Sequence, residues 1–332
     1  MKLSVAVILV ATLALGPRLK GAPGAAHPRE LGQISGRDYV RLTDWAKANS
    51  FHLRWLKRDQ SFQLSSLSTK CRFAVDSREA QVNGVGVWLS FPVAFREGTP
   101  FLAKLDVQAT LQPLLSPPKN PPGAGVKSIC LDPGHGGRDP GNRVGPYQEK
   151  KYTLLLAQEV GRQLTRAGLK VALTRSSDAS IELNERPEVA KRTKADLFLS
   201  LHFNSVETSR TVVRGAEVYC LTPVGASSTN ARGEGANAGW CPGNRNNNKN
   251  LYLAYQVQKA LTRNLTVDDR GVRRARFAVL RDATMPAVLI EAGFMSHPEE
   301  GRRIFDNAYR RQMARAIVDG LLAYKRAVEQ AG

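Results

Sequence analysis

The stretch Val126-Lys127-Ser128-Ile129-Cys130-Leu131-Asp132-Pro133-Gly134-His135-Gly136-Gly137-Arg138-Asp139-Pro140-Gly141 decides the fold of this chain. Its first six residues are mainly β-branched or apolar, which predicts a buried strand. The glycines and prolines that follow predict a turn-rich loop at the end of that strand. Such a loop can present His135 to a cleft. A plain surface loop is the alternative, because short motifs also match by chance.

Two further apolar runs also lead into a polar side chain, a histidine in one case and a glutamate in the other. Residues 195–201 lead into His202, and residues 287–290 lead into Glu291. In an open α/β sheet, ligands bind outside the carboxyl ends of the strands, so these side chains are expected at one edge. Glu149 begins a helical pattern just after the first loop and is expected to open onto the same edge. Two imidazoles and a carboxylate form a set that zinc accepts, with a fourth position left for water.

These segments resemble the zinc-dependent N-acetylmuramoyl-L-alanine amidases, which trim bacterial peptidoglycan. The resemblance covers about residues 126 to 327, in the family's order. The residues that carry it are Asp132-Pro133-Gly134-His135-Gly136-Gly137, Glu149-Lys150, Leu173-Thr174-Arg175, Ser200-Leu201-His202-Phe203-Asn204, Arg270-Gly271-Val272, Val279-Leu280-Arg281 and Pro286-Ala287-Val288-Leu289-Ile290-Glu291-Ala292-Gly293-Phe294.

The resemblance implies a role for each candidate site residue. It implies that Zn²⁺ is held by His135, Glu149 and His202, and that Glu291 is the general base of an amide hydrolysis. Asn204 and Arg281 flank this site and are candidates for substrate contact. A glutamate that begins a helix, as Glu149 does, is also favoured by the helix dipole without any metal.

Two other functions remain open at this point. A zinc peptidase or deacetylase would use the same metal set on another wall bond. A non-catalytic wall-binding protein would keep the fold, although the intact set of candidate residues argues against it. The substrate that the resemblance implies is peptidoglycan, and the need for an envelope activator protein stays open.

The first residues of the chain predict export. Met1-Lys2 precede an apolar run from Leu3 to Leu15 and then small residues, so residues 1–26 read as a signal peptide. We therefore expect a periplasmic, cell-wall or extracellular protein with no transmembrane segment after signal removal. The net charge of +19 comes from 48 scattered Lys and Arg. With export, this favours anionic envelope polymers as partners over nucleic acid.

The four cysteines form an even number in a chain that is expected to be exported. Cys220 ends a strand-like run and Cys241 lies in a Gly/Asn-rich loop. We hypothesise that these two form a disulfide, which would stabilise the fold by about 3 kcal/mol in the loop-entropy model. Zinc ligation by cysteine is not expected, because no pair has the short spacing of such sites.

The chain is expected to divide at a proline-rich linker, residues 113–125. Before it, residues 37–112 predict a small α+β domain that resembles the copper amine oxidase N-terminal domain, for which wall binding, partner contact and structural support are the expected alternatives. Its strongest local signal is a hairpin across Asn83-Gly84. Helical spacing is seen in residues 37–51 and 102–111, and short strands are expected at 62–67 and 71–75.

After the linker, residues 126–328 are expected to form the catalytic α/β domain. Alternating strands and helices predict a mostly parallel twisted sheet flanked by helices. The expected strands are residues 127–131, 169–175, 195–202, 216–221, 277–281 and 287–290. The expected helices are residues 149–167, 181–194, 250–264 and 298–327.

Overall fold

The computed structural model describes residues 31–230 and 239–330. The predicted signal peptide, residues 1–26, lies outside the described residues. In the part of the chain that is described, no helix is long and apolar enough to cross a membrane.

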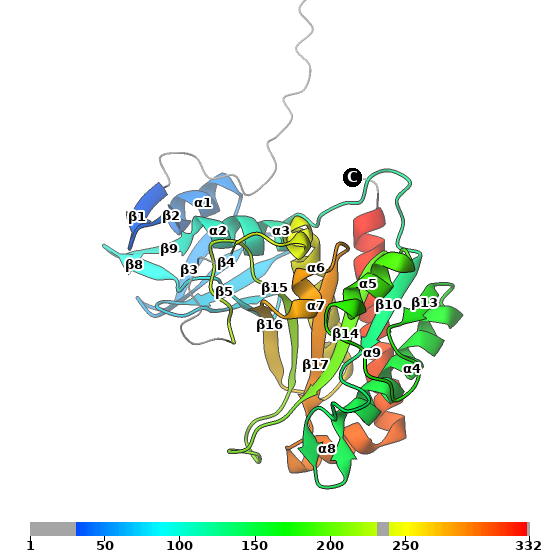
Figure 1. Cartoon of the computed structure of the whole chain (residues 1–332). Coiled ribbons are helices and arrows are strands. Elements are labelled where there is room, and N and C mark those ends of the chain that lie inside the picture. The colour runs from blue at the N-terminus through cyan, green and yellow to red at the C-terminus, as the bar shows by residue number, and fades with distance from the viewer. Residues whose placement is uncertain (1–30, 231–238, 331–332) are drawn as a thin grey trace, which may run out of the picture.

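The N-terminal part of the chain (residues 31–115) is rich in strands (Figure 1). Its elements are β1 (Leu31–Ile34), β2 (Arg37–Arg41), α1 (Leu42–Ala48), β3 (His52–Lys57), β4 (Ser61–Ser65), β5 (Lys70–Ala74), β6 (Glu79–Val82), β7 (Val85–Trp88), β8 (Ala94–Arg96), β9 (Thr99–Ala103), α2 (Lys104–Asp106), the π-helical turn η2 (Val107–Leu111) and α3 (Gln112–Leu115). The hairpin across Asn83-Gly84 is confirmed as β6–β7, and both turn residues have positive φ, as a type I′ turn requires.

The C-terminal part (residues 126–330) alternates between strands and helices. Its elements are β10 (Ser128–Pro133), β11 (Arg143–Val144), β12 (Tyr147–Gln148), α4 (Glu149–Arg166), β13 (Lys170–Leu173), α5 (Glu185–Arg192), β14 (Leu197–Asn204), β15 (Ala216–Leu221), η3 (Pro242–Asn246), α6 (Asn247–Asn264), β16 (Asp269–Ala275), α7 (Ala278–Arg281), β17 (Ala287–Phe294), α8 (Pro298–Phe305) and α9 (Asn307–Glu329).

One sheet of eleven strands joins the two parts, in the order β13-β10-β14-β17-β15-β16-β7-β6-β5-β4-β3. The strands β13, β10, β14 and β17 pair in parallel, whereas β15 runs antiparallel to β17. The parallel pairing of β16 with β7 joins the parts, and β7 to β3 form an antiparallel meander. A separate sheet of four strands has the order β1-β2-β9-β8. The fold is therefore a mixed α/β sheet with a β-rich N-terminal part.

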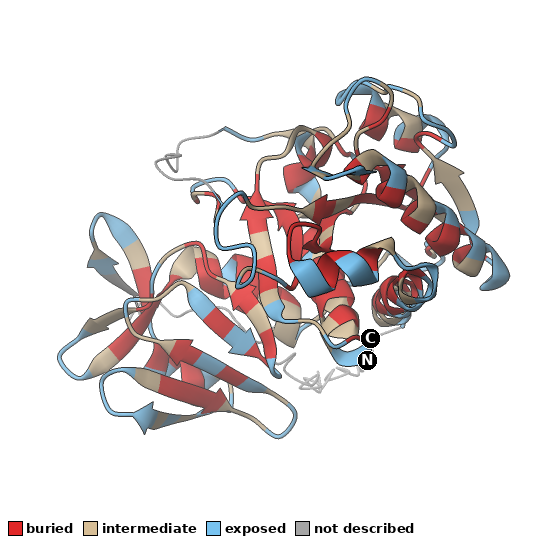
Figure 2. Cartoon of the chain, turned by 90° about the horizontal axis from the view of Figure 1, so that it is seen from below, coloured by how far each residue is buried: buried red, intermediate tan, exposed pale blue. Residues whose placement is uncertain are grey.

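Helices cover both faces of the C-terminal sheet. Along β17, Val288 and Ile290 belong to a core that contains side chains of α4, α6 and α9, whereas Leu289 faces a second core with α5 and α7. Buried strands with apolar residues on both faces are expected for a covered parallel sheet. In Figure 2 the central strands are red along most of their length, while those of the N-terminal part alternate between buried and exposed residues.

The structure corrects three predictions. Residues 278–281 form α7 and not a strand, and the expected final helix is two helices, α8 and α9, separated at Asp306, which caps α9 through Tyr309 N. Cys220 and Cys241 are free thiols. The Cys220 thiol is buried and contacts the Arg273 carbonyl, whereas the Cys241 thiol contacts Asn244 at the start of η3. The strand β16 was not predicted.

Because the sheet is continuous, we predict that the two parts unfold together. Trp45, Trp55 and Trp88 lie in the N-terminal part, whereas most of the helix lies in the C-terminal part. In a Trp240→Phe variant, urea transitions followed by fluorescence and by far-ultraviolet circular dichroism should therefore coincide. A fluorescence transition at clearly lower urea concentration would show that the parts unfold independently.

Candidate metal centre

The loop after β10 brings His135 to the carboxyl edge of the sheet. His135 has a φ of +62° and is half-buried. Two glycines allow the loop to approach the other site residues closely. A Cβ atom on Gly134 would collide with the His202 ring, and one on Gly141, whose φ is +64°, would collide with His135 and Glu149. The glycine-rich sequence is thus required by close packing at this site.

The buried carboxylate of Asp132 anchors this loop. Asp132 accepts hydrogen bonds from Thr174 Oγ1 (2.6 Å), Arg186 Nη1 (2.8 Å) and Ser200 Oγ (2.7 Å). Arg186 also donates from Nη1 to the Pro133 carbonyl (3.1 Å) and from Nη2 to the His135 carbonyl (3.0 Å). Asp132 and Arg186 are both buried, so each compensates the charge of the other. This network fixes the backbone that carries His135.

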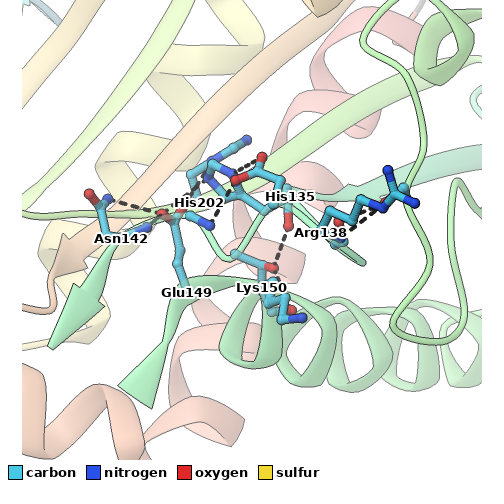
Figure 3. Close-up of polar contacts among 12 residues, drawn as sticks. His135, Arg138, Asn142, Glu149, Lys150 and His202 are labelled. Atoms are coloured by element: carbon cyan, nitrogen blue, oxygen red, sulfur yellow. Dashed lines mark hydrogen bonds and ion pairs between the residues drawn. The ribbon is translucent and has the colours of Figure 1, made fainter. Parts of the chain in front are cut away.

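Glu149, the first residue of α4, lies between the two histidines (Figure 3). Its Oε2 is 3.1 Å from His135 Nε2 and its Oε1 is 3.0 Å from His202 Nδ1. The backbone N–H groups of Asn142 and Phe203 and the Asn142 side chain also donate to this carboxylate. Glu149 is only 1% exposed, so both of its oxygens are held in place.

Electrostatics at this cluster favour a cation. Burial alone would raise the pKa of Glu149, but hydrogen bonds and charge from His135 and His202 lower it well below its usual range. Burial alone would lower the pKa of His135, but the carboxylates of Glu149 and Asp139 raise it overall. His135 therefore holds its proton more tightly than a free imidazole does, at a position where a metal ion could replace that proton.

The residues present fit a divalent metal ion. One ligand atom each from His135, Glu149 and His202 can be chosen so that all three lie within 4.8 Å of one another. His135 Nδ1 is 2.6 Å from Asp139 Oδ2, which leaves Nε2 directed towards Glu149. A carboxylate on the far nitrogen of a ligating histidine is the usual support of a metal site.

The strand register places Glu291 next to this cluster. It pairs with His202 of β14 on one side and with Glu217 of β15 on the other, so the three side chains share one face. Glu291 Oε2 is buried and has no hydrogen-bond partner among the described residues. Burial, followed by the charges of Glu149 and Glu217, raises the pKa of Glu291 well above its usual value. An unpartnered carboxyl oxygen next to a metal-ligating set is suited to proton transfer.

The cluster opens into a cavity of about 420 Å³. Glu291 and the three candidate ligands line it, together with Leu183 and Phe277. Leu183 is 60% exposed. The cavity thus combines apolar walls with polar side chains that converge on one point, as ligand sites commonly do.

The structure places the other predicted residues outside this cavity. Asn204 donates from Nδ2 to Glu217 Oε1 (2.9 Å), and Arg281 ends α7; neither is among the residues that line the cavity. Their roles in substrate contact stay predictions. Sequence reasoning missed Arg186, Asp139 and Glu217. For Asp139, its position four residues after His135 was an available signal; Arg186 and Glu217 become recognisable only through tertiary contacts.

We predict that Asp139→Asn weakens metal binding by about 10- to 100-fold, because the neutral amide no longer supports the His135 ring as an anion does. Competition with a chromophoric chelator measures this affinity. Glu188→Gln changes a carboxylate on α5 whose side chain is 44% exposed, and serves as the control. Equal metal affinity in wild type and Asp139→Asn would contradict a supporting role.

For the metal-free protein we predict a pH-dependent effect of Glu291→Gln. The raised pKa means that the folded protein holds the Glu291 proton more tightly than the unfolded chain does. Stability from this group is therefore present below its unfolded pKa and is lost as the pH rises. The variant should gain in Tm over wild type at pH 8 but not at pH 4. A gain that is equal at both pH values would contradict a raised pKa.

Comparisons with known proteins were consistent with this geometry. Residues 129–323 match the family model described as N-acetylmuramoyl-L-alanine amidase. N-acetylmuramoyl-L-alanine amidase AmiC of Neisseria meningitidis is 35% identical over 218 residues, which are 59% of this chain and 52% of that protein. The chain thus spans about half the length of this curated relative.

Two solved structures are also similar. AmiC2 of Nostoc punctiforme has a TM-score of 0.51 and 34% identity, covering 61% of this chain and 99% of that one. The CwlD amidase of Clostridioides difficile was solved in complex with the GerS lipoprotein. It has a TM-score of 0.50 and 26% identity, and the match covers 60% of this chain and 98% of that one. The family match spans more than half of the chain and contains all four residues of the candidate centre. The chain therefore belongs to the N-acetylmuramoyl-L-alanine amidase family.

Proposed function

We propose that this protein is an exported zinc amidase that cleaves the bond between the lactyl group of N-acetylmuramic acid and L-alanine of the stem peptide. The observation that carries the proposal is the convergence of His135, Glu149 and His202 beside the unpartnered carboxyl oxygen of Glu291. Membership of the amidase family supports the choice of bond. The pattern of residues 1–26 supports export to the periplasm or cell wall.

His135, Glu149 and His202 would hold Zn²⁺ as three protein ligands. Zinc in such an open set supplies Lewis acidity, which lowers the pKa of a water molecule towards about 7 and polarises a carbonyl. Asp139 keeps the His135 ring oriented through Nδ1. The hydrogen bonds of Asn142 and Phe203 hold the Glu149 carboxylate while it serves as a ligand.

Glu291 is proposed to carry the proton through the reaction. Its Oε2 takes a proton from the attacking water while that water's oxygen bonds to the lactyl carbonyl carbon. The same carboxyl group then returns the proton to the nitrogen of L-alanine as the C–N bond breaks. A carboxyl whose pKa is raised by burial is suited to this return step. Leu183 and Phe277 contribute apolar side chains to the walls of the cavity.

An envelope activator is proposed as a partner. The similar CwlD amidase was solved in complex with a lipoprotein, which supports an envelope protein as a partner. Peptidoglycan is the proposed substrate, and the net charge of +19 supports retention at anionic envelope polymers.

The proposal predicts the products of peptidoglycan digestion by the exported form of the full chain. Mass spectrometry should find free stem peptides that begin with L-alanine, and a zinc chelator should abolish them. Glu291→Gln should lower the rate by about 10²- to 10⁴-fold, the usual contribution of a general acid–base, while it keeps its zinc.

Glu188→Gln, on α5 and outside the residues that line the cavity, is the matched control and should leave the rate unchanged. Peptides cut at another bond would instead favour a zinc peptidase or deacetylase. Full activity of Glu291→Gln would contradict the role of that residue.

A further inference from the structure

A second cavity, of about 600 Å³, lies where the N-terminal part meets β16. We name it the seam trough; its lining includes Arg72, Gln81, Trp88, Asp269, Arg270 and Arg273. The two parts are tied at this place. Asp269 Oδ2 accepts a hydrogen bond from Gly86 N (2.7 Å), and Trp88 Nε1 donates to the Arg270 carbonyl (3.2 Å). The trough is therefore built by both parts of the chain.

The seam trough lies on the same face of the sheet as the candidate metal centre. Glu291 pairs with Glu217, and Tyr219, two residues along β15, pairs with Arg273 of β16. Side chains alternate along a strand, so Glu291, Glu217 and Arg273 all project from one face. Strands lie about 4.8 Å apart, which places β16 about 10 Å from the strand that carries Glu291. On the same face Trp88, one strand further, packs against Arg273.

Two arginines in the trough share a single carboxylate. Glu217 Oε2 is 3.0 Å from Arg270 Nε and 2.8 Å from Arg273 Nε. The other oxygen, Oε1, accepts hydrogen bonds from Asn204 Nδ2 and Tyr219 Oη. Two positive charges therefore face one negative charge, and Glu217 has no oxygen left over. Glu79 and Asp269 are the carboxylates that line the trough, and both oxygens of Asp269 already accept hydrogen bonds, from Gly86 N and Gly271 N.

Aromatic rings hold the two arginines in place. The Arg273 guanidinium lies 4.3 Å from the centre of the Trp88 ring, and that of Arg270 lies 4.8 Å from the Phe294 ring. Their side chains are only 14% and 29% exposed. Among the described residues, the hydrogen bonds found for these two side chains come from Nε, to Glu217 Oε2 and to the Arg270 carbonyl. The terminal N–H groups of a fixed guanidinium match the two oxygens of a carboxylate.

We propose that Arg270 and Arg273 bind a carboxylate of the stem peptide, so that the N-terminal part forms one wall of an extended substrate site. This inference rests on the proposed function. An extended peptide advances about 3.3 Å per residue, so the second or third residue beyond the scissile amide reaches β16. The stem peptide carries carboxylates at such positions. Guanidinium groups fixed side by side favour this acidic segment over the neutral sugar.

The test compares one muropeptide, a disaccharide tetrapeptide, with its analogue in which the stem carboxylates are amidated. For the zinc-loaded full chain, amidation should lower kcat/KM about tenfold, equivalent to about 1.4 kcal/mol, mainly through KM. In Arg273→Gln and in Arg270→Gln, the same amidation should change kcat/KM less than twofold. Arg96→Gln removes an exposed arginine of β8 outside the trough and should behave as wild type.

A purely structural role of the arginines would lower activity on both substrates by the same factor. That result, or a wild type that is indifferent to amidation, would overturn the inference. If the wild type cleaves neither substrate, the proposed function fails, and the inference is tested by calorimetric titration of the free acidic tetrapeptide. Binding that is equal in wild type and in both variants, or absent from wild type, would then overturn it.

Discussion

The structure of the site depends on one buried carboxylate. Glu149 begins α4 and contacts His135, which lies in the loop after β10, and His202, which lies on β14. An ionised carboxylate with 1% exposure is stable only if positive charge or hydrogen bonds compensate it. The two histidines provide that compensation here, and a divalent cation would provide it more strongly. The requirement for compensation therefore explains why three separate segments converge on one point.

The second constraint is the register of the central sheet. Parallel pairing of β14 with β17 sets His202 beside Glu291, and antiparallel pairing of β17 with β15 sets Glu217 beside Glu291. A slip of one residue would turn each side chain to the opposite face. The same register continues through β16 to β7, so the N-terminal part extends the face that carries the site. A unit that sequence composition separates from the rest is thereby placed where it can contact a long substrate.

The catalytic half of the fold could be predicted from local signals. Apolar runs of strand length end at His135, His202 and Glu291, and the helical periodicity after Glu149 matches α4. The strand β16 (Asp269–Ala275) could not be predicted in this way, because four of its seven residues are charged and its arginines contact segments that are distant in the sequence. The segment 277–281 was predicted as a strand for its apolar residues, and a short apolar run is compatible with either structure. The thiols of Cys220 and Cys241 were paired on an even cysteine number, on expected export and on their positions at a strand end and in a loop, none of which contains side-chain geometry.

The most direct test is a crystal structure of the zinc-loaded protein with anomalous data collected on both sides of the zinc absorption edge. The account predicts one strong peak bounded by His135, Glu149 and His202, about 2.0–2.2 Å from each ligand atom. It also predicts that Glu291 reaches the open coordination position without ligating the ion. A peak elsewhere, or one ligated by Glu291 in place of Glu149, would contradict the account.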